Sequence, residues 1–235
     1  ASDNETLAEA AANTAGNSLS LTSAVQGGAS AGLLNRQSNY ASVGAQATSA
    51  YGIGAHASSD ASSLVDRNVT SSMARGNMAA NMLAVSGVVE DGCTPDLASI
   101  TTGALNSAKA PAVLSNVQMN AGGGSAYAAA PTVSVSYGSV GVSDSRLGVT
   151  GNSVSAAAYG NSATNMVTLA SLGSLPASGV SNVQTNSGAV TAQVTNAAYT
   201  ITSPGLSTSR IDLSGNSISA SAIGNAATSK VTVSR

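Results

Sequence analysis

The chain has 235 residues, enough for one or two domains, but it contains no Phe or Trp, and its 43% hydrophobic fraction comes largely from Ala and Val. Such small side chains fill an interior at native density only where backbones approach closely, which excludes a wide globular core and favours thin sheet layers or coils. Charged residues make up 8% of the chain with a net charge of −2, and the eight basic residues are scattered, so the basic footprint of a nucleic-acid-binding protein is absent.

The N-terminus reads ASDNETL, without an initiator Met. This start is typical of a mature chain after signal-peptide removal behind a small residue. No apolar run approaches the ~20 residues that a membrane-spanning helix requires. We therefore expect a secreted protein of the extracellular cell surface, with no membrane span in this chain.

A first repeat block begins at Asp3 and recurs three times without a gap. A fixed period of this kind is typical of a repeat architecture, in which each repeat forms one structural unit. Successive copies are 64, 84 and 64 residues apart. The four copies are residues 3–21, 67–85, 151–169 and 215–233.

Hydrophobic residues inside this block alternate with a period of two, which predicts β-strands. In the third copy Val154, Ala156 and Ala158 share one face, and a second alternating set follows Gly160. Gly-Asn pairs between the two sets favour tight turns, because Gly and Asn both tolerate positive φ. We therefore predict strand, turn or arc, strand, with turns at Asn77, Asn161 and Asn225.

A second block, marked by the pattern N-x-Q-x-N, lies between the copies of the first block. Its three copies are residues 35–48, 116–129 and 182–195. The order of the blocks is second then first, three times, after one unaccompanied first block at the N-terminus. The chain is therefore predicted to be a single repeat domain covering residues 1–235.

The recurring amide residues support two interpretations that the sequence leaves open. In stacked repeats, identical side chains lie about 4.8 Å apart and form hydrogen-bonded ladders. Alternatively, Asn marks turns. The ladder candidates are Asn4, Asn68, Asn152, Asn216, Gln37, Gln118 and Gln184.

An irregular stretch, residues 86–111, interrupts the repeats and contributes to the longer spacing of the second and third copies. We interpret it as an insertion on the repeat scaffold. It contains Cys93, the only cysteine, which cannot form an internal disulfide. Cys93 is either a thiol that pairs with another chain or a small buried or free thiol.

Residues for catalysis, cofactors or metals are missing from the sequence. His56 is the only histidine, so no His-based zinc site can be assembled, and one Cys excludes thiolate clusters. No D-x-[DN]-x-[DN]-G calcium loop is found. We predict that the protein is not an enzyme and binds no cofactor.

The N-x-Q-x-N motifs and the segments AYGNSAT (158–164) and AIGNAAT (222–228) carry a resemblance to known surface proteins. They resemble curli-type subunits, the head repeats of trimeric autotransporter adhesins and, most of all, the holdfast-anchor family of bacterial surface proteins. The period of about 64 residues is longer than the curli and autotransporter repeats. The resemblance implies extracellular adhesion or anchoring, as in a biofilm or holdfast.

The sequence thus predicts an all-β repeat architecture, either a β-solenoid or stacked β-hairpins in a sandwich. Strand edges left open at the two ends are templates for further chains. We expect a structural subunit that forms a filament through head-to-tail or donated-strand contacts, with other surface proteins or polysaccharide as further partners. The alternative is a monomeric binding module, either an adhesin tip or an ice-binding solenoid, for which only Thr200 and Thr202 show the Thr-x-Thr spacing.

Overall fold

The computed structural model describes residues 1–23, 31–55, 58–59, 62–87, 112–137, 142–171 and 178–234. Within these residues the regular structure is β-strand, and every pair of strands is parallel. The predicted all-β repeat fold is therefore confirmed. Parallel pairing identifies it as a β-solenoid, because antiparallel hairpins cannot produce this ladder.

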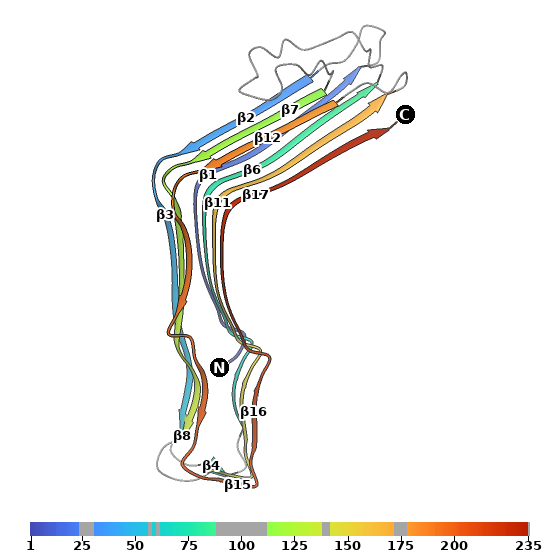
Figure 1. The fold of residues 1–235 in the computed structure, drawn as a ribbon. Helices are drawn as coiled ribbons and strands as arrows, with labels where there is room; N and C mark the ends of the chain where they lie inside the picture. The colour runs from blue at the N-terminus through green and yellow to red at the C-terminus, as the bar shows by residue number, and fades with distance from the viewer. Residues whose placement is uncertain are drawn as a thin grey trace.

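The chain forms a leading half coil and three full coils (Figure 1). The half coil is β1 (Glu5–Ser23). The first full coil comprises β2 (Ala31–Asn39), β3 (Val43–Ala55), β4 (Ser58–Ser59), β5 (Ser62–Asp66) and β6 (Val69–Gly87). The second comprises β7 (Ala112–Asn120), β8 (Gly124–Tyr137), β9 (Val142–Ser143), β10 (Arg146–Thr150) and β11 (Ser153–Ser171). The third comprises β12 (Ser178–Asn186), β13 (Val190–Thr195), β14 (Tyr199–Thr202), β15 (Leu206–Ser207), β16 (Arg210–Ser214) and β17 (Ser217–Ser234).

Equivalent strands of successive coils stack into sheets. The front sheet has the order β1-β6-β11-β17, and its register aligns Glu5, Val69, Ser153 and Ser217. The back of the coil is formed by β2-β7-β12 and, further along, by β3, β13 and β14 on β8. Two small sheets, β5-β10-β16 and β4-β9-β15, close the coil. The front-sheet register equals the spacing of the first repeat block.

The molecule is long, narrow and bent (Figure 1). Front and back strands run in opposite directions and change direction at the same height, which we call the elbow. In the front sheet the inward-facing positions change phase at Gly76-Asn77 and Gly160-Asn161, and we place the elbow there and at the equivalent Gly224-Asn225. In the back it lies at the short links after β2, β7 and β12.

The predicted turns at Asn77, Asn161 and Asn225 are wrong, because β6, β11 and β17 continue through these residues. The strand bends there and changes its inward phase, so that Ala74 and Asn77 are both fully buried. A β-carbon at Gly160 would collide with the carbonyl oxygen of Gly224 and with the Asn186 side chain. Glycine is therefore required by close approach rather than by a turn.

Back strands lie between front strands rather than opposite them. Between β1 and β6, β2 accepts a hydrogen bond from Asn13 Nδ2 to Ser38 O (2.9 Å) and donates one from Gln37 Nε2 to Met78 O (2.9 Å). The same two bonds place β7 between β6 and β11. They also place β12 between β11 and β17. Four front strands thus leave three positions between them, and one back strand occupies each position.

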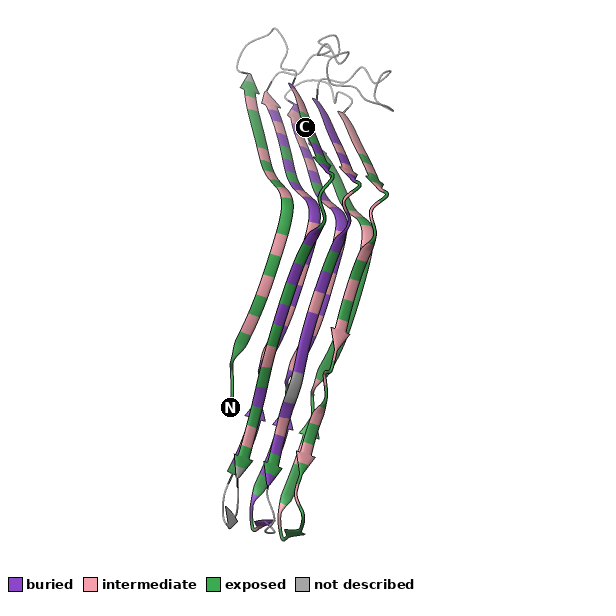
Figure 2. Ribbon diagram, turned by 90° about the vertical axis from the view of Figure 1, so that its left-hand side faces the viewer, coloured by how far each residue is buried: buried purple, intermediate pink, exposed green. Residues whose placement is uncertain are grey.

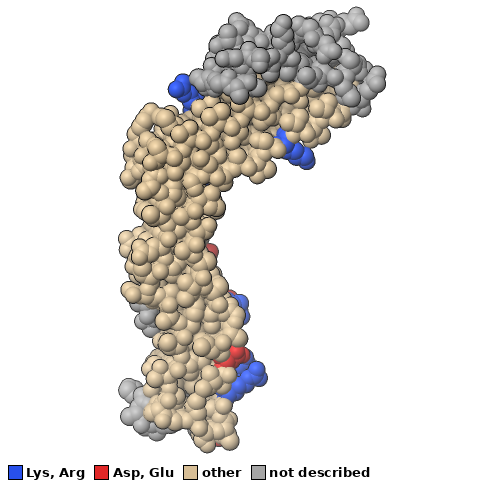
Figure 3. Space-filling view, in the orientation of Figure 1, with Lys and Arg blue, Asp and Glu red and all other residues tan. Residues whose placement is uncertain are grey.

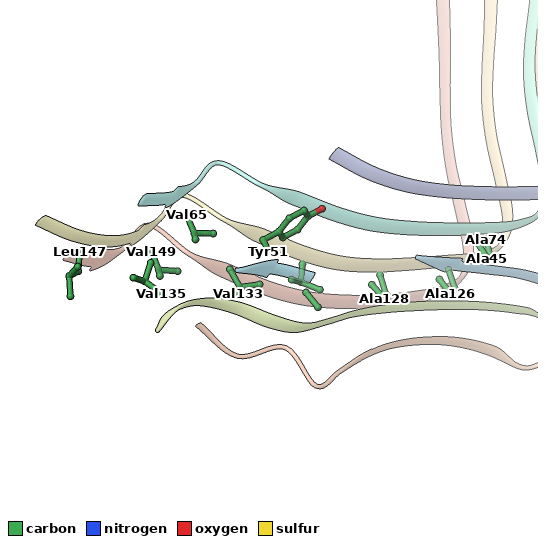
Figure 4. Close-up of a cluster of buried hydrophobic side chains, with 14 of the residues drawn as sticks. Ala45, Tyr51, Val65, Ala74, Ala126, Ala128, Val133, Val135, Leu147 and Val149 are labelled. Carbon is green, nitrogen blue, oxygen red and sulfur yellow. The ribbon is translucent and has the colours of Figure 1, made fainter. Parts of the chain in front are cut away.

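The interior has two apolar parts separated by the polar elbow. The larger part lies between β3 and β8 on one side and β5, β10 and the first halves of the front strands on the other, where Tyr51, Val133, Val149 and their neighbours point inward (Figure 4). The smaller part lies beyond the elbow and includes Leu83, Leu114 and Leu169. Figure 2 shows alternating buried residues along the inner strands and mainly exposed residues on the strands at the two ends of the stack.

Two sequence features lie largely or wholly outside the described residues. Of the insertion 86–111, Ser86 and Gly87 end β6, and residues 88–111, including Cys93, are not described. His56 also lies outside them.

Candidate functional site

The first Asn column stands where the front strands begin, and its members form a hydrogen-bonded ladder. Asn4 Nδ2 donates to Asn68 Oδ1 (2.7 Å), Asn68 Nδ2 to Asn152 Oδ1 (2.9 Å) and Asn152 Nδ2 to Asn216 Oδ1 (2.9 Å). Asn68 and Asn152 are buried. Because a buried amide costs free energy unless it is hydrogen-bonded, the ladder satisfies these side chains from layer to layer.

The elbow column forms a second ladder in place of the predicted turns. Asn13 Nδ2 donates to Asn77 Oδ1 (2.7 Å), Asn77 Nδ2 to Asn161 Oδ1 (2.8 Å) and Asn161 Nδ2 to Asn225 Oδ1 (2.7 Å). Positive φ, the basis of the turn prediction, is absent at these Asn residues. The role of Asn at this position is therefore to place an amide side chain in the interior, and the chain does not reverse its direction here.

A third front ladder, which the sequence analysis did not single out, runs through Asn17, Asn81 and Asn165. At the fourth position Asn165 Nδ2 lies 3.4 Å from Ser229 Oγ. The sequence does contain a signal for this ladder, because three of the four copies of the first block carry Asn in this column. Each of the three also donates to a back-strand Asn: Asn17 to Asn35, Asn81 to Asn116 and Asn165 to Asn182.

The N-x-Q-x-N motifs supply the ladders of the back strands. Gln184 Nε2 donates to Gln118 Oε1 (2.7 Å), and Gln118 Nε2 donates to Gln37 Oε1 (2.7 Å). The flanking ladders are Asn35-Asn116-Asn182 and Asn39-Asn120-Asn186. Front and back amides thus meet inside the elbow as one connected polar network.

The elbow ladder has a direction, fixed by a second hydrogen bond from the same nitrogen. Asn77 Nδ2 also donates to Met119 O (2.9 Å), and Asn161 Nδ2 also donates to Thr185 O (2.9 Å). A carbonyl oxygen can be bonded only by the amide nitrogen, so this contact determines which side-chain atom is nitrogen. Asn ladders therefore donate toward the C-terminal coil. The Gln ladder donates toward the N-terminal coil.

The C-terminal coil exposes side chains that belong to core columns. Ile218 is 50% exposed although its column neighbour Val154 is 1% exposed. Leu213 is 53% exposed, whereas Val149 beside it is fully buried. Four further apolar residues of the last coil behave in the same way, namely Leu206, Ile211, Val231 and Val233. Their exposure arises because no further coil lies against them in the described residues.

Asn225 departs from the bonding pattern of its column for the same reason. Its Nδ2 turns back to Gln184 O at 3.3 Å. In the preceding coils the equivalent nitrogen bonds a forward Asn and a forward back-strand carbonyl. Within the described part of the chain, both of these partners are absent for Asn225.

Among the described residues, no strand pairs with the outer edge of β1 either. A hollow of about 420 Å³ is lined by Ala12–Ala15 of β1 and Asn35–Ser38 of β2. The outward Oδ1 atoms of Asn4, Asn13 and Asn17 have no hydrogen-bond partner among the described residues. In the Asn columns the N-terminal end therefore presents acceptors, and the C-terminal end presents donors.

Two ion pairs attach β1 to the first full coil. Arg67 bonds both carboxylate oxygens of Asp3 (2.7 and 2.9 Å) at a corner where Asp3 and Arg67 have φ of 54° and 51°. This contact lowers the pKa of Asp3, mainly through the hydrogen bond from Arg67. Arg75 pairs with Glu9. Elsewhere charges are sparse on the face that Figure 3 shows.

The described residues contain no group of three or more His, Cys, Asp or Glu side chains arranged to bind a metal ion. No helix suited to crossing a membrane occurs among them. The chain matches no family model, no curated protein and no solved structure. The site that the geometry defines is therefore the pair of open coil ends.

Proposed function

We propose that the protein is a structural, non-enzymatic subunit of an extracellular filament or cell-surface adhesive assembly, and that its copies associate through the open coil ends. The observation that carries the proposal is the exposure of core columns on the last coil, with Ile218 and Leu213 about half exposed. Solenoids normally end in polar caps, and unpaired strand edges recruit further strands. A contact that joins unlike ends produces a filament when it does not close into a ring.

Secretion and a relationship to holdfast-anchor or curli-like surface proteins belong to the same proposal. Low charge and the Ser and Thr residues at outward positions of strands such as β11 and β17 support a location outside the cell. Other surface-assembly proteins and polysaccharide remain the further partners that we propose. The proposal does not depend on Cys93, which lies outside the described residues.

The ice-binding form of the alternative, a monomeric module, requires a regular array of threonines. Thr200 and Thr202 lie in β14, where their column neighbours on β8 are Ser134 and Ser136. The next strand, β3, places Gly52 and Gly54 in these columns. The threonine pair is therefore not repeated along this stack, and this alternative gains no support from the described coils.

The test is negative-stain electron microscopy of the purified 235-residue chain at increasing concentration, with and without reductant. We expect filaments with a uniform width, independent of reductant if Cys93 is not part of the contact. A monodisperse monomer at high concentration in both conditions would refute the proposal.

A further inference from the structure

Simple end-to-end stacking leaves a defect in this fold. The front sheet has four strands and the back has three positions between them. If β17 paired with β1 of the next copy, front strands would be continuous. One back position at each junction would stay empty, because β12 and the next β2 would lie two strand spacings apart. The open edges of β12 and β2 and the half-exposed Ile218, Val231 and Val233 would remain uncovered.

We propose that β1 is a removable cap, and that during assembly β17 of one copy replaces β1 on β6 of the next copy. This inference rests on the proposed function, since it specifies how the two ends join. The next copy then contributes β2 directly beside β12, β3 beside β13 and β14, and β5 beside β16. The result is an uninterrupted solenoid of three coils per chain.

The strand register permits this replacement. Glu5 of β1 and Ser153 of β11 both pair with Val69 of β6, and Ser153 pairs with Ser217 of β17. β17 therefore belongs to the same columns as β1, without a gap. Both strands carry Asn in the elbow column, as Asn13 and Asn225. A strand of one chain that completes the sheet of another is the principle of donor-strand complementation.

The unused hydrogen-bonding groups at the C-terminal end match the next copy in this arrangement. Asn225 Nδ2 would reach Asn77 Oδ1 and Ser38 O of the next copy, the two acceptors that Asn13 Nδ2 occupies within one chain. Among the described residues, Asn182 Nδ2 and Gln184 Oε1 have no partner. They face the positions of Asn35 and Gln37 of the next copy with the polarity that each ladder requires.

The exchange conserves front-sheet pairing and adds back-sheet pairing. The β1–β6 ladder is lost, and a β17–β6 ladder of similar length replaces it. New ladders form at β12, β13, β14, β15 and β16, whose outer edges are open in the single chain. Burial of the exposed core columns adds apolar contact. The balance therefore favours replacement once β1 is released.

Two contacts are specific to β1 and hold the cap in a free subunit. Arg67 pairs with Asp3, and Arg75 pairs with Glu9. In β17 the corresponding columns hold Gly215 and Ser221, which cannot form ion pairs. Release of β1 would therefore be the slow step, seen as a lag before assembly.

A reversible lock tests the inference. In a Cys93→Ser background, Thr14→Cys with Met78→Cys places two thiols on the outer face at a paired position of β1 and β6. Neighbouring strands are about 4.8 Å apart, within the range for a disulfide. We expect the oxidised protein to remain monomeric and reductant to restore assembly. The matched control, Thr164→Cys with Thr228→Cys, locks β17 to β11, which stay paired, and should assemble whether oxidised or reduced.

Every outcome of this experiment is decisive. Assembly of the oxidised β1–β6 lock at the rate of the reduced protein would overturn the cap while leaving the proposed function intact. A block by the β11–β17 control would also overturn it, because β17 would then have to leave β11. Failure of both the wild-type chain and the Cys93→Ser parent, with neither lock, to assemble would instead count against the proposed function.

A pair of single substitutions gives a second readout with opposite signs. Asn13→Ala removes two hydrogen bonds that hold β1, so the lag should shorten by about five-fold. Asn225→Ala removes the bonds that β17 would form with the next copy, so assembly should slow by a similar factor. If both variants slow assembly, β1 is part of the contact and the cap is excluded.

Discussion

Gly160 and Gly224 occupy the same column of the front sheet but differ in what surrounds them. A β-carbon at Gly160 would meet the Gly224 carbonyl and the Asn186 side chain, whereas one at Gly224 would meet only Asn186 Nδ2, at 3.4 Å. We expect Gly160→Ala to lower the free energy of unfolding by about 2–3 kcal/mol through overpacking. Gly224→Ala should leave it nearly unchanged. Urea denaturation of the monomer measures both, and equal losses would show that the bend itself requires glycine.

Ser72 carries a buried hydroxyl with no hydrogen-bond partner among the described residues. It is 1% exposed, and its column otherwise contains Ala8, Ala156 and Ala220. An unsatisfied buried hydroxyl is destabilising, so Ser72→Ala should raise the free energy of unfolding by about 1 kcal/mol. Thermal denaturation followed by circular dichroism would detect the increase. A lower melting temperature would mean that the hydroxyl has a partner, such as an internal water.

At the scale of the strand, the back ladder of glutamines connects all three coils. Gln118 bonds Gln37 and Gln184 and also donates to Ser162 O (3.1 Å). Gln118→Leu keeps the approximate volume but leaves these groups without partners, so we expect a loss of about 3 kcal/mol. The matched control is Gln184→Leu, at the end of the same ladder and half-buried.

The comparison of these two variants by urea denaturation distinguishes ladder connectivity from simple side-chain replacement. Gln184 has one ladder neighbour, so Gln184→Leu should cost less than half as much as Gln118→Leu. Equal costs for the two variants would show that the ladder does not act as a connected network.

Strand register could be predicted from the sequence, but the shape of the coil could not. The repeat spacing aligned Asn4, Asn68, Asn152 and Asn216, and these residues do form one ladder. The elbow was misread because Gly-Asn is a common turn pair, and local sequence does not show that both flanking segments face the same interior. The phase change from Ala74 to Asn77 was the available clue.

The candidate site could be predicted only in part. Open edges follow from the order of the repeat blocks. The half-step between front and back strands, by which each back strand lies between two front strands, does not follow from it. That half-step depends on amide-to-carbonyl bonds across the interior, such as Gln37 to Met78 O and Asn77 to Met119 O. Their partners lie far apart in sequence and outside any repeated motif. The unaccompanied first block at the N-terminus indicated that β1 has no back strand of its own, but no pattern in the sequence indicated that back strands lie between front strands.

For the whole molecule, the ion pair between Asp3 and Arg67 makes the release of β1 sensitive to acid. Arg67 lowers the pKa of Asp3 below 3.8, and Asp66 is the other carboxylate on Arg67. The contribution of Asp3 to holding β1 is therefore complete above pH 3.8 and is lost as pH falls through the lower pKa of the folded chain. We expect the lag before assembly to shorten by about two-fold between pH 5 and pH 3 through this exposed pair. Asp3→Asn should remove that part of the pH dependence, and an unchanged profile would contradict it.

Added salt should also shorten the lag before assembly, because the side chains of both ion pairs, Asp3–Arg67 and Glu9–Arg75, are partly exposed to water. The exposed fractions are 62% and 58% for Arg67 and Asp3, and 21% and 60% for Arg75 and Glu9. Screening is nearly complete at about 1 M salt, where the Debye length is about 3 Å. The lag, followed by light scattering, should therefore shorten about three-fold, since exposed pairs contribute little each.

Glu9→Gln should shorten the lag at low salt and reduce its salt dependence, because one of the two pairs is already gone. The control Asp212→Asn breaks a contact between β16 and β10 that stays intact on assembly. It should change neither the lag at low salt nor the salt dependence of the lag. A lag that lengthens with salt would mean that charges join the copies rather than restrain the cap.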